Sequence, residues 1–227
     1  MASNPLEPRA AVPFRFPVAR ASDRLAVMTS ANGNRELWLV RHGETPASKG
    51  RTLAGWADVP LTPHGEEQAL ALRPLLAGER FDGVWSSDLR RAVTTARLAW
   101  GEPRQDERLR EMSFGALEGL PWETLGPGFQ EGLARFEGFA APEGESFDDL
   151  RSRVLSFVDG LLPGRHVLFT HGGVVRLLSR EVGEDHFVPT GTLLVVDWDA
   201  RRLVSRRDGE GEASRGLPAP AGAEEGR

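Results

Sequence analysis

Two histidines in this 227-residue chain follow short apolar runs and precede glycine. His42 comes after the apolar run 37–40 and Arg41, and His171 comes after the run 167–170. Short apolar runs that stop at glycine are typical of buried strands, and open α/β sheets bind ligands beyond the carboxyl ends of their strands. We therefore expect the two imidazoles to meet at one edge of a sheet. Because Arg41 adjoins the first of them, the expected ligand is an anion.

The surroundings of the two histidines suit such chemistry. A neutral imidazole is a competent nucleophile, and Gly43 lets the backbone approach a ligand closely. Gly172-Gly173 leads into an apolar helix, and backbone N–H groups at the start of that helix could also face an anion. Taken singly, each histidine could instead be a structural residue bonded to the backbone, but their paired context favours the chemical interpretation. His166 lies five positions before His171 and so on the opposite face of the strand, which disfavours a metal site formed by these two.

A third candidate is Arg90, in the first turn of a helix that we expect to begin near Asp88. A cation at that position opposes the helix dipole unless an anion offsets it. We therefore expect Arg90 to face the anion and its neighbour Arg91 to face solvent. A solvated helix arginine is the alternative interpretation of Arg90.

A fourth candidate, Glu111, lies in an apolar loop punctuated by glycines, at positions 109–119. A partly buried carboxyl group with a raised pKa can protonate a leaving oxygen and later accept a proton from water. The alternative for Glu111 is an ordinary salt bridge to Arg108 or Arg110. The second carboxyl group of the loop, Glu118, is expected to be structural.

Strands and helices alternate along the chain, as the positioning of these residues requires. Apolar patterns and capping residues predict strands near 36–41, 82–86, 167–170 and 192–197, with 202–205 as a partner of the last, and helices near 63–77, 88–100, 146–161 and 173–182. This alternation predicts an α/β fold, a three-layer α/β/α sandwich with a mostly parallel central sheet and an antiparallel edge.

The domain boundaries follow from composition. Residues 1–34 hold four prolines without hydrophobic periodicity, and residues 208–227 are rich in Gly, Glu and Pro, so both ends are expected to be disordered. One domain, 35–207, lies between them, with 120–145 as a cap-like insertion. No secretory signal or membrane span is expected, and the cytoplasm is the expected location.

Charge and cysteine content exclude several classes of function. The net charge is −5, which argues against binding to nucleic acid or to anionic membranes. The chain has no cysteine, so disulfides, thiolate nucleophiles and cysteine-ligated metals are excluded. We expect a small-molecule partner and a monomer or homodimer.

Five motifs, in order over roughly residues 36–206, resemble the histidine phosphatase (phosphoglycerate mutase-like) superfamily. They are Arg41-His42-Gly43-Glu44-Thr45, the Gly55-Trp56 to Leu61-Thr62 segment, Ser86-Ser87-Asp88-Leu89-Arg90-Arg91, Glu111 to Gly119, and Thr170-His171-Gly172-Gly173. Five linked motifs are far more specific than any one of them. The resemblance implies a phosphoglycerate mutase-like fold.

The resemblance also implies roles. His42 would accept the phosphoryl group as a phosphohistidine that water then hydrolyses, and Glu111 would act first as acid and then as base. Arg41, Arg90 and His171 would hold the phosphate oxygens, joined by the Gly172 amide. No metal or other cofactor is required, and nearby arginines should keep His42 neutral. Charge neutralisation and in-line positioning are what phosphoryl transfer needs.

One departure from the family pattern concerns the sixth position after His42. Many members have Asn there, whereas this chain has Ser48, with a single hydroxyl donor. Ser48 or Thr45 is expected to reach the phosphate in its place, and both rank below the other candidates.

The branch of the family is suggested by the insertion. Cofactor-dependent mutases usually place Lys, Tyr and paired Arg there, whereas residues 120–145 have Arg135 alone of these, together with Trp122 and phenylalanines. This composition suits a bulkier, less charged leaving group and resembles that of α-ribazole-phosphate phosphatases of cobalamin synthesis. A phosphoglycerate mutase and a non-enzymatic phospho-ligand-binding protein are the alternatives, and aromatic residues that only fill the core are the structural alternative.

Overall fold

The structure, a computed structural model, describes residues 33–185 and 187–209. One mixed sheet has the strand order β3-β2-β4-β1-β5-β6. The strands are β1 (Arg35–Arg41), β2 (Gly83–Ser86), β3 (Arg104–Gln105), β4 (Gly164–Thr170), β5 (Leu193–Asp197) and β6 (Arg202–Arg207). The first four strands in the sheet order pair in parallel. β5 then pairs antiparallel with β1, and β6 pairs antiparallel with β5. The prediction of a parallel middle and an antiparallel edge is confirmed.

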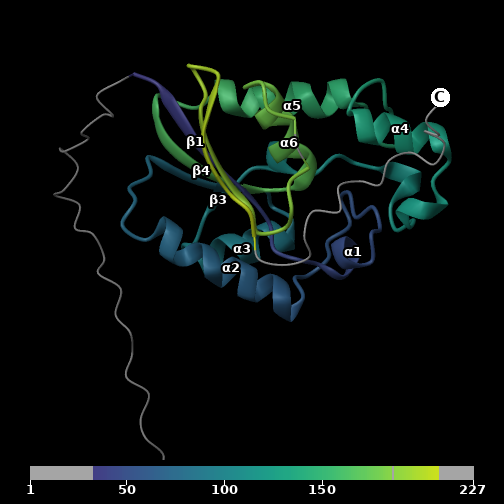
Figure 1. Ribbon diagram of the computed structural model, residues 1–227, viewed down its shortest axis with the longest axis horizontal. Coiled ribbons are helices and arrows are strands. Elements are labelled where there is room, and N and C mark those ends of the chain that lie inside the picture. The colour runs from purple at the N-terminus through teal and green to yellow at the C-terminus, as the bar shows by residue number, and fades with distance from the viewer. Residues whose placement is uncertain (1–32, 186, 210–227) are drawn as a thin grey trace, which may run out of the picture.

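Helices cover both faces of this sheet, as Figure 1 shows. The described α-helices are α1 (Pro46–Lys49), α2 (Pro63–Leu76), α3 (Arg90–Ala99), α4 (Pro127–Arg135), α5 (Phe147–Asp159) and α6 (Gly172–Arg180), of which α2 and α3 cover one face and α5 and α6 the other. Side chains alternate along β1, so that Leu39 packs in the cluster with α5 and α6 whereas Val40 packs with α2 and α3. The three-layer α/β/α sandwich is confirmed.

Local capping explains why two of the helices begin where the sequence predicts. Thr62 caps α2 by accepting a hydrogen bond from the Gly65 N–H at 3.0 Å. Ser146 and Asp149 form both bonds of a capping box at the start of α5. Gly65 has a second role. A Cβ on Gly43 would overlap the Gly65 backbone, and a Cβ on Gly65 would overlap the Glu44 backbone. The two glycines thus let the loop after β1 pack directly against α2.

The structure differs from the sequence prediction at α3. This helix begins at Arg90 rather than near Asp88, and Asp88 instead forms an ion pair with Arg110. The Arg90 N–H donates to the Asp58 carboxylate at 2.7 Å, so a residue 32 positions earlier in the chain caps the helix.

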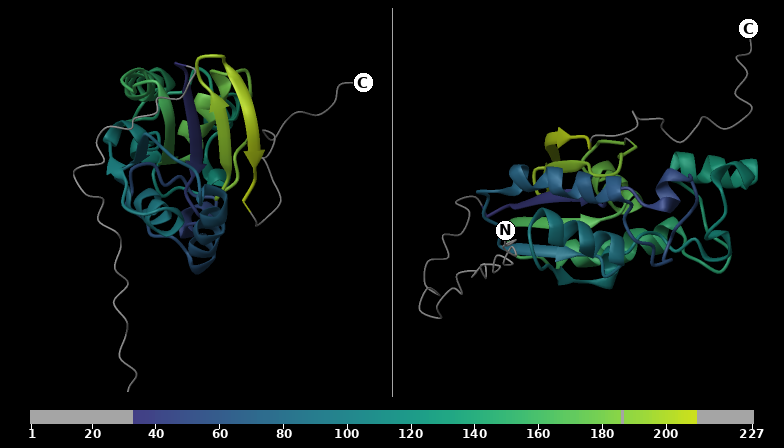
Figure 2. Two further views of the ribbon diagram at one scale, coloured as in Figure 1. Left: turned by 90° about the vertical axis from the view of Figure 1, so that its left-hand side faces the viewer. Right: turned by 90° about the horizontal axis from the view of Figure 1, so that it is seen from below.

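The insertion at 120–145 contains α4 and a short 3₁₀ helix, Trp122–Thr124. Figures 1 and 2 show α4 at the same end of the molecule as α1, beyond the edge of the sheet. Three glycines in or beside α4 lower its helix propensity, which is why the sequence pattern does not predict it.

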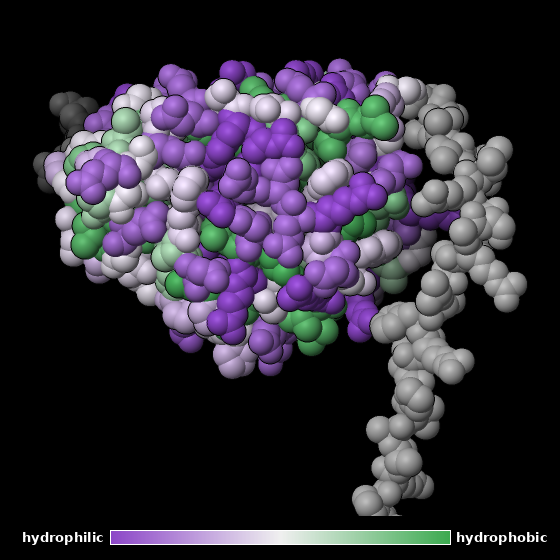
Figure 3. All heavy atoms as spheres, turned by 180° about the vertical axis from the view of Figure 1, so that it is seen from behind, coloured by the Kyte–Doolittle hydropathy of each residue, from purple (hydrophilic) through white to green (hydrophobic). Residues whose placement is uncertain are grey.

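The predicted disordered ends lie largely outside the described residues, at 1–32 and 210–227. Within the described part of the chain, no helix has the length and apolar character needed to span a bilayer. Figure 3 shows a mainly hydrophilic face on which apolar side chains are scattered in small groups.

Candidate active site

The two histidines meet where β1 and β4 end. The strands pair in parallel with Arg41 opposite Thr170, and the His42 N–H donates to the Thr170 carbonyl at 2.9 Å. His42 and His171 are the next residues in this register, and their ring centroids are 5.2 Å apart. The expected meeting of the two imidazoles at one sheet edge is therefore confirmed.

Their hydrogen bonds give the two rings opposite tautomers. His42 Nδ1 lies 2.7 Å from the Gly43 carbonyl, which can only accept, so Nδ1 carries the proton and Nε2 keeps a lone pair. His171 Nδ1 accepts from Arg91 Nε at 3.2 Å, so its proton lies on Nε2. Among the described residues, the buried His171 Nε2 and Arg41 Nε have no hydrogen-bond partner. Two buried donors are thus available to an anion.

Arg91, not Arg90, is the helix arginine at this site. Arg91 is 1% exposed, and besides His171 it donates to the carbonyls of Ala57 at 2.8 Å and Gly55 at 2.7 Å. Arg90 is exposed. The prediction that Arg90 faces the anion and Arg91 the solvent is wrong, because the buried face of α3 runs through Arg91 and, one turn later, Thr95.

Burial and neighbouring charge keep both histidines neutral. Desolvation, followed by the charges of Arg91 and Arg41, holds the pKa of His42 well below its usual value, as the sequence predicts. Desolvation, then Arg91 and His42, lowers the pKa of His171 in the same way. Burial also lowers the pKa of Arg41 to about 10, with Glu111 opposing the shift. Two guanidinium groups beside two neutral imidazoles give the site a net positive charge, and a bound anion would offset the repulsion between them.

Glu111 faces the same site. Its Oε1 accepts from the Met112 N–H at 2.9 Å and its Oε2 from the Gly173 N–H at 3.0 Å, at the start of α6. A Cβ on Gly173 would overlap this carboxyl group, and one on Gly172 would lie 3.2 Å from Arg41 Cζ. The glycines after His171 therefore give Glu111 and Arg41 their places beside α6.

The salt bridge considered as the alternative for Glu111 does not form. Arg110 pairs instead with Asp88, and Arg108 with Asp106. The carboxyl group thus remains directed at the site.

A cavity of about 410 Å³ opens at this edge of the sheet. Its lining includes the polar or charged residues Arg41, His42, Arg91 and Glu111, further cations at Lys49, Arg51 and Arg176, and six apolar residues of one hydrophobic cluster, Met112, Phe114, Trp122, Leu133, Phe136 and Phe147. His171 is fully buried, packs against His42 and is not itself among the lining residues. Arg90 does not line it.

Thr45 and Ser48 also line the cavity, but they cap α1. The Ser48 N–H donates to Thr45 Oγ1 at 3.0 Å, and the Thr45 N–H donates to Ser48 Oγ at 2.8 Å. Both hydroxyl groups are engaged in this capping box, and their contact with phosphate stays a prediction.

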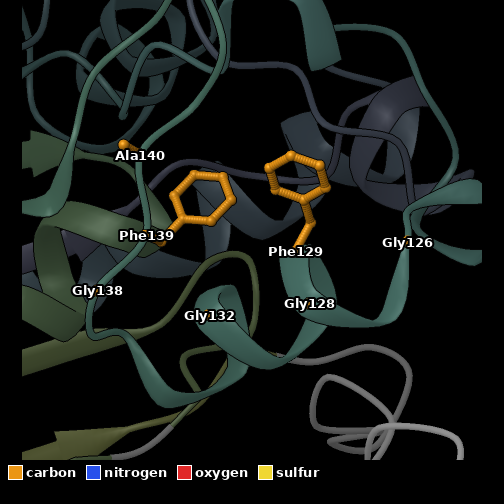
Figure 4. Close-up of a pocket in the computed structure, with 7 residues that line it drawn as sticks. All are labelled: Gly126, Gly128, Phe129, Gly132, Gly138, Phe139 and Ala140. Atoms are coloured by element: carbon orange, nitrogen blue, oxygen red, sulfur yellow. The ribbon is translucent and has the colours of Figure 1, made fainter.

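A second pocket, of about 430 Å³, lies beside α4 (Figure 4). It is lined by Gly126, Gly128, Phe129, Gly132, Gly138, Phe139 and Ala140. None of these side chains is titratable or nucleophilic, so the chemistry belongs to the cavity at the sheet edge.

Comparison with known proteins agrees with this geometry. The family model of the histidine phosphatase superfamily (branch 1) matches residues 37–202. The chain belongs to this superfamily. The adenosylcobalamin/alpha-ribazole phosphatase of Escherichia coli K12 is 36% identical over 163 residues, which cover 65% of this chain and 79% of the relative. The crystal structure of phosphoglycerate mutase from Thermus thermophilus is 51% identical with a TM-score of 0.71, covering 75% of this chain and 97% of that one.

This member of the superfamily also uses two segments to which the sequence patterns gave no role at the site, the Gly55-Trp56 motif and the end of the 109–119 loop. The 55–57 segment supplies the carbonyls that hold Arg91, and Glu118 fixes this segment by accepting from the N–H groups of Trp56 at 2.8 Å and Ala57 at 3.1 Å. Glu118 is thus structural, as expected. The available signal was Gly55, whose φ of +50° favours glycine and whose missing Cβ leaves room for the Glu118 carboxylate.

Proposed function

We propose that the protein is a phosphomonoesterase that transfers a phosphoryl group to His42 and then to water. The observation that carries the proposal is the contrast at Nδ1 of the paired histidines, a carbonyl oxygen beside His42 and a guanidinium N–H beside His171, which implies opposite tautomers. His42 keeps a lone pair on Nε2 and His171 a proton on Nε2, the two ring centroids lie 5.2 Å apart, and Arg91 bonds the second of them. A nucleophile surrounded by donors is the combination that phosphoryl transfer requires.

In the first step, His42 Nε2 attacks phosphorus, so that an N–P bond forms as the ester O–P bond breaks. Glu111 donates a proton to the leaving oxygen, which departs as an alcohol. Each Glu111 oxygen accepts one N–H and keeps a second lone pair that can carry this proton. The Nδ1–H bond to the Gly43 carbonyl stabilises the phosphorylated ring.

In the second step, water attacks phosphorus and the N–P bond breaks. Glu111 takes the proton from that water, and neutral His42 is regenerated with inorganic phosphate as the product. Arg41, Arg91, the His171 N–H and the Gly172 amide neutralise the charge of the transferred group, so side chains rather than a metal supply the positive charge.

For the substrate, we propose a small phosphorylated metabolite whose alcohol portion is bulky and apolar, with α-ribazole phosphate as the specific candidate. The apolar side chains that line the cavity support this choice. Two arginines that line the cavity are paired, Arg176 with Asp185 and Arg51 with Glu123, which leaves Lys49 as the lining cation to test for contact with a substrate carboxylate. The similarity to an alpha-ribazole phosphatase supports it as well.

Phosphoglycerate mutase activity is the second candidate, because a phosphoglycerate mutase is 51% identical to this chain. The two activities are separable. Phosphatase activity predicts release of inorganic phosphate from a panel of phosphorylated metabolites, with the highest kcat/KM for α-ribazole phosphate. Rapid formation of 2-phosphoglycerate from 3-phosphoglycerate and a bisphosphoglycerate primer, without release of phosphate, would contradict the proposal.

A further inference from the structure

Glu111 lies in a loop that belongs to no strand or helix. Residues 110–114 lie between two short 3₁₀ helices, Glu107–Leu109 and Gly115–Leu117. A proton donor must nevertheless stand within hydrogen-bond reach of the reacting oxygen. The backbone of this loop therefore needs other partners to stay in place.

Arg153, on α5, bonds three carbonyls in and just before this loop. Its NH1 donates to the carbonyls of Arg108 at 2.9 Å and Arg110 at 2.7 Å, and its NH2 donates to the carbonyl of Glu111 itself at 2.8 Å. The remaining N–H groups bind Glu145, from Nε at 2.6 Å and from NH2 at 2.8 Å. All five donors of the guanidinium group are thus occupied.

Glu145 holds the other side of the loop. Its Oε2 accepts from the Ser113 N–H at 2.8 Å, and its own N–H donates to the Ser113 carbonyl at 2.9 Å. The side chains of Arg153 and Glu145 are only 16% and 15% exposed. A largely desolvated ion pair is stable when its remaining donors and acceptors are bonded, and here the loop backbone bonds them.

We infer that the Arg153–Glu145 pair positions Glu111 for proton transfer, an inference that rests on the proposed function. Neither side chain lines the cavity, so both are positioning residues rather than catalytic ones. They fix the backbone on both sides of Glu111, and Trp56 Nε1 adds a second bond to the Glu111 carbonyl at 2.7 Å. Loss of the pair displaces the acid and leaves His42 and its arginines in place.

The test compares two substrates. Dinitrophenyl phosphate has a leaving group that departs without a proton, whereas benzyl phosphate needs one. The parameter is kcat/KM, which covers the steps up to departure of the leaving group and so excludes the later attack of water. Glu111→Gln calibrates the method, because it should slow benzyl phosphate far more than dinitrophenyl phosphate.

Arg153→Lys should lower kcat/KM for benzyl phosphate by roughly tenfold to a hundredfold, because a displacement of about 1 Å can cost that much. A lysine has three donors in a tetrahedral array and cannot bind all these acceptors. Glu145→Gln should act in the same direction, and both variants should leave dinitrophenyl phosphate nearly unchanged. The matched control is Arg151→Lys, on the same helix, where Arg151 is 52% exposed and pairs with Glu181.

Combined with Glu111→Gln, Arg153→Lys should slow benzyl phosphate no further, since the acid is already absent. Equal slowing of both substrates, or unchanged rates in both variants, would overturn the inference. If Arg153→Lys does not fold, Glu145→Gln carries the test. If Glu111→Gln itself slows both substrates equally, it is the proposed acid role of Glu111 that fails instead.

Discussion

The ends of β1 and β4 are alike in sequence and opposite in chemistry. Each strand contains an apolar run and is followed directly by a histidine and a glycine, and the two imidazoles are 5.2 Å apart. One Nδ1 faces a carbonyl that accepts, and the other faces a guanidinium that donates. A single neighbour at Nδ1 thus decides whether Nε2 presents a lone pair or a proton.

The segments after the two histidines also differ. The chain after His42 continues through Gly43 and Glu44 to the capping box of α1, whereas His171 leads directly into α6 as its N-cap. The β1 end therefore presents a side chain on a loop, and the β4 end presents a helix N-terminus as well. A nucleophile and an anion-holding site arise from nearly the same local sequence.

Replacing each histidine in turn should separate the two roles most strongly. His42→Ala should abolish the phosphoenzyme and lower hydrolysis of p-nitrophenyl phosphate by at least about 10⁴-fold, as expected for loss of a nucleophile. His171→Ala keeps the nucleophile and loses one donor, so we expect a loss of about 10²- to 10³-fold with phosphohistidine still formed.

Acid-quenched labelling with radioactive phosphate and steady-state kinetics measure these two effects, and circular dichroism confirms folding. Turnover retained by His42→Ala would refute the assignment of the nucleophile. A phosphoenzyme lost in His171→Ala but retained in His42→Ala would exchange the two roles.

The arginines offer a smaller but sharper contrast. Arg91→Lys keeps the charge, but a lysine cannot donate to His171, to the Gly55 carbonyl and to the Ala57 carbonyl at the same time. We expect kcat/KM to fall by about 10²-fold. Arg90→Lys is the matched control, one residue earlier and exposed, and should leave kcat/KM unchanged. The reverse outcome would restore the role that the sequence assigned to Arg90.

The fold was predictable wherever local patterns decide it. Thr62 and the Ser146–Asp149 capping box mark helix starts that the structure contains. The adjacency of His42 and His171 was predictable because parallel strands end at one edge of a sheet. The glycine-rich α4 was not, since partners distant in sequence contact it, such as Arg176 and Arg180, which donate to its terminal carbonyls.

The site was harder to predict where a role depends on distant partners. Arg90 and Arg91 are neighbours in sequence, and only the packing of α3 shows which one is buried. Arg153 lies 42 residues from Glu111, and no local pattern connects them. Residues that perform the chemistry stand out by type and spacing, whereas those that hold them in place become visible only in three dimensions.

The smallest expected effect concerns pH and tests the property that the two strand ends share. Burial lowers the pKa of both His42 and His171, so both stay neutral in the folded protein while the unfolded chain binds protons below about pH 6.5. The contribution of these groups to stability is therefore complete above that pH and is lost as the pH falls. Each histidine should account for at most about 1.4 kcal/mol per pH unit.

Urea unfolding from about pH 7.5 to about pH 5 measures this loss. The free energy of unfolding of the wild type should decrease on acidification, and His42→Ala and His171→Ala should each flatten the slope by up to one proton. Flattening in only one variant would mean that the other imidazole is protonated in the folded state, and its strand end would then differ in charge as well as in tautomer. Unchanged slopes in both variants would contradict the neutral state on which a nucleophilic His42 depends.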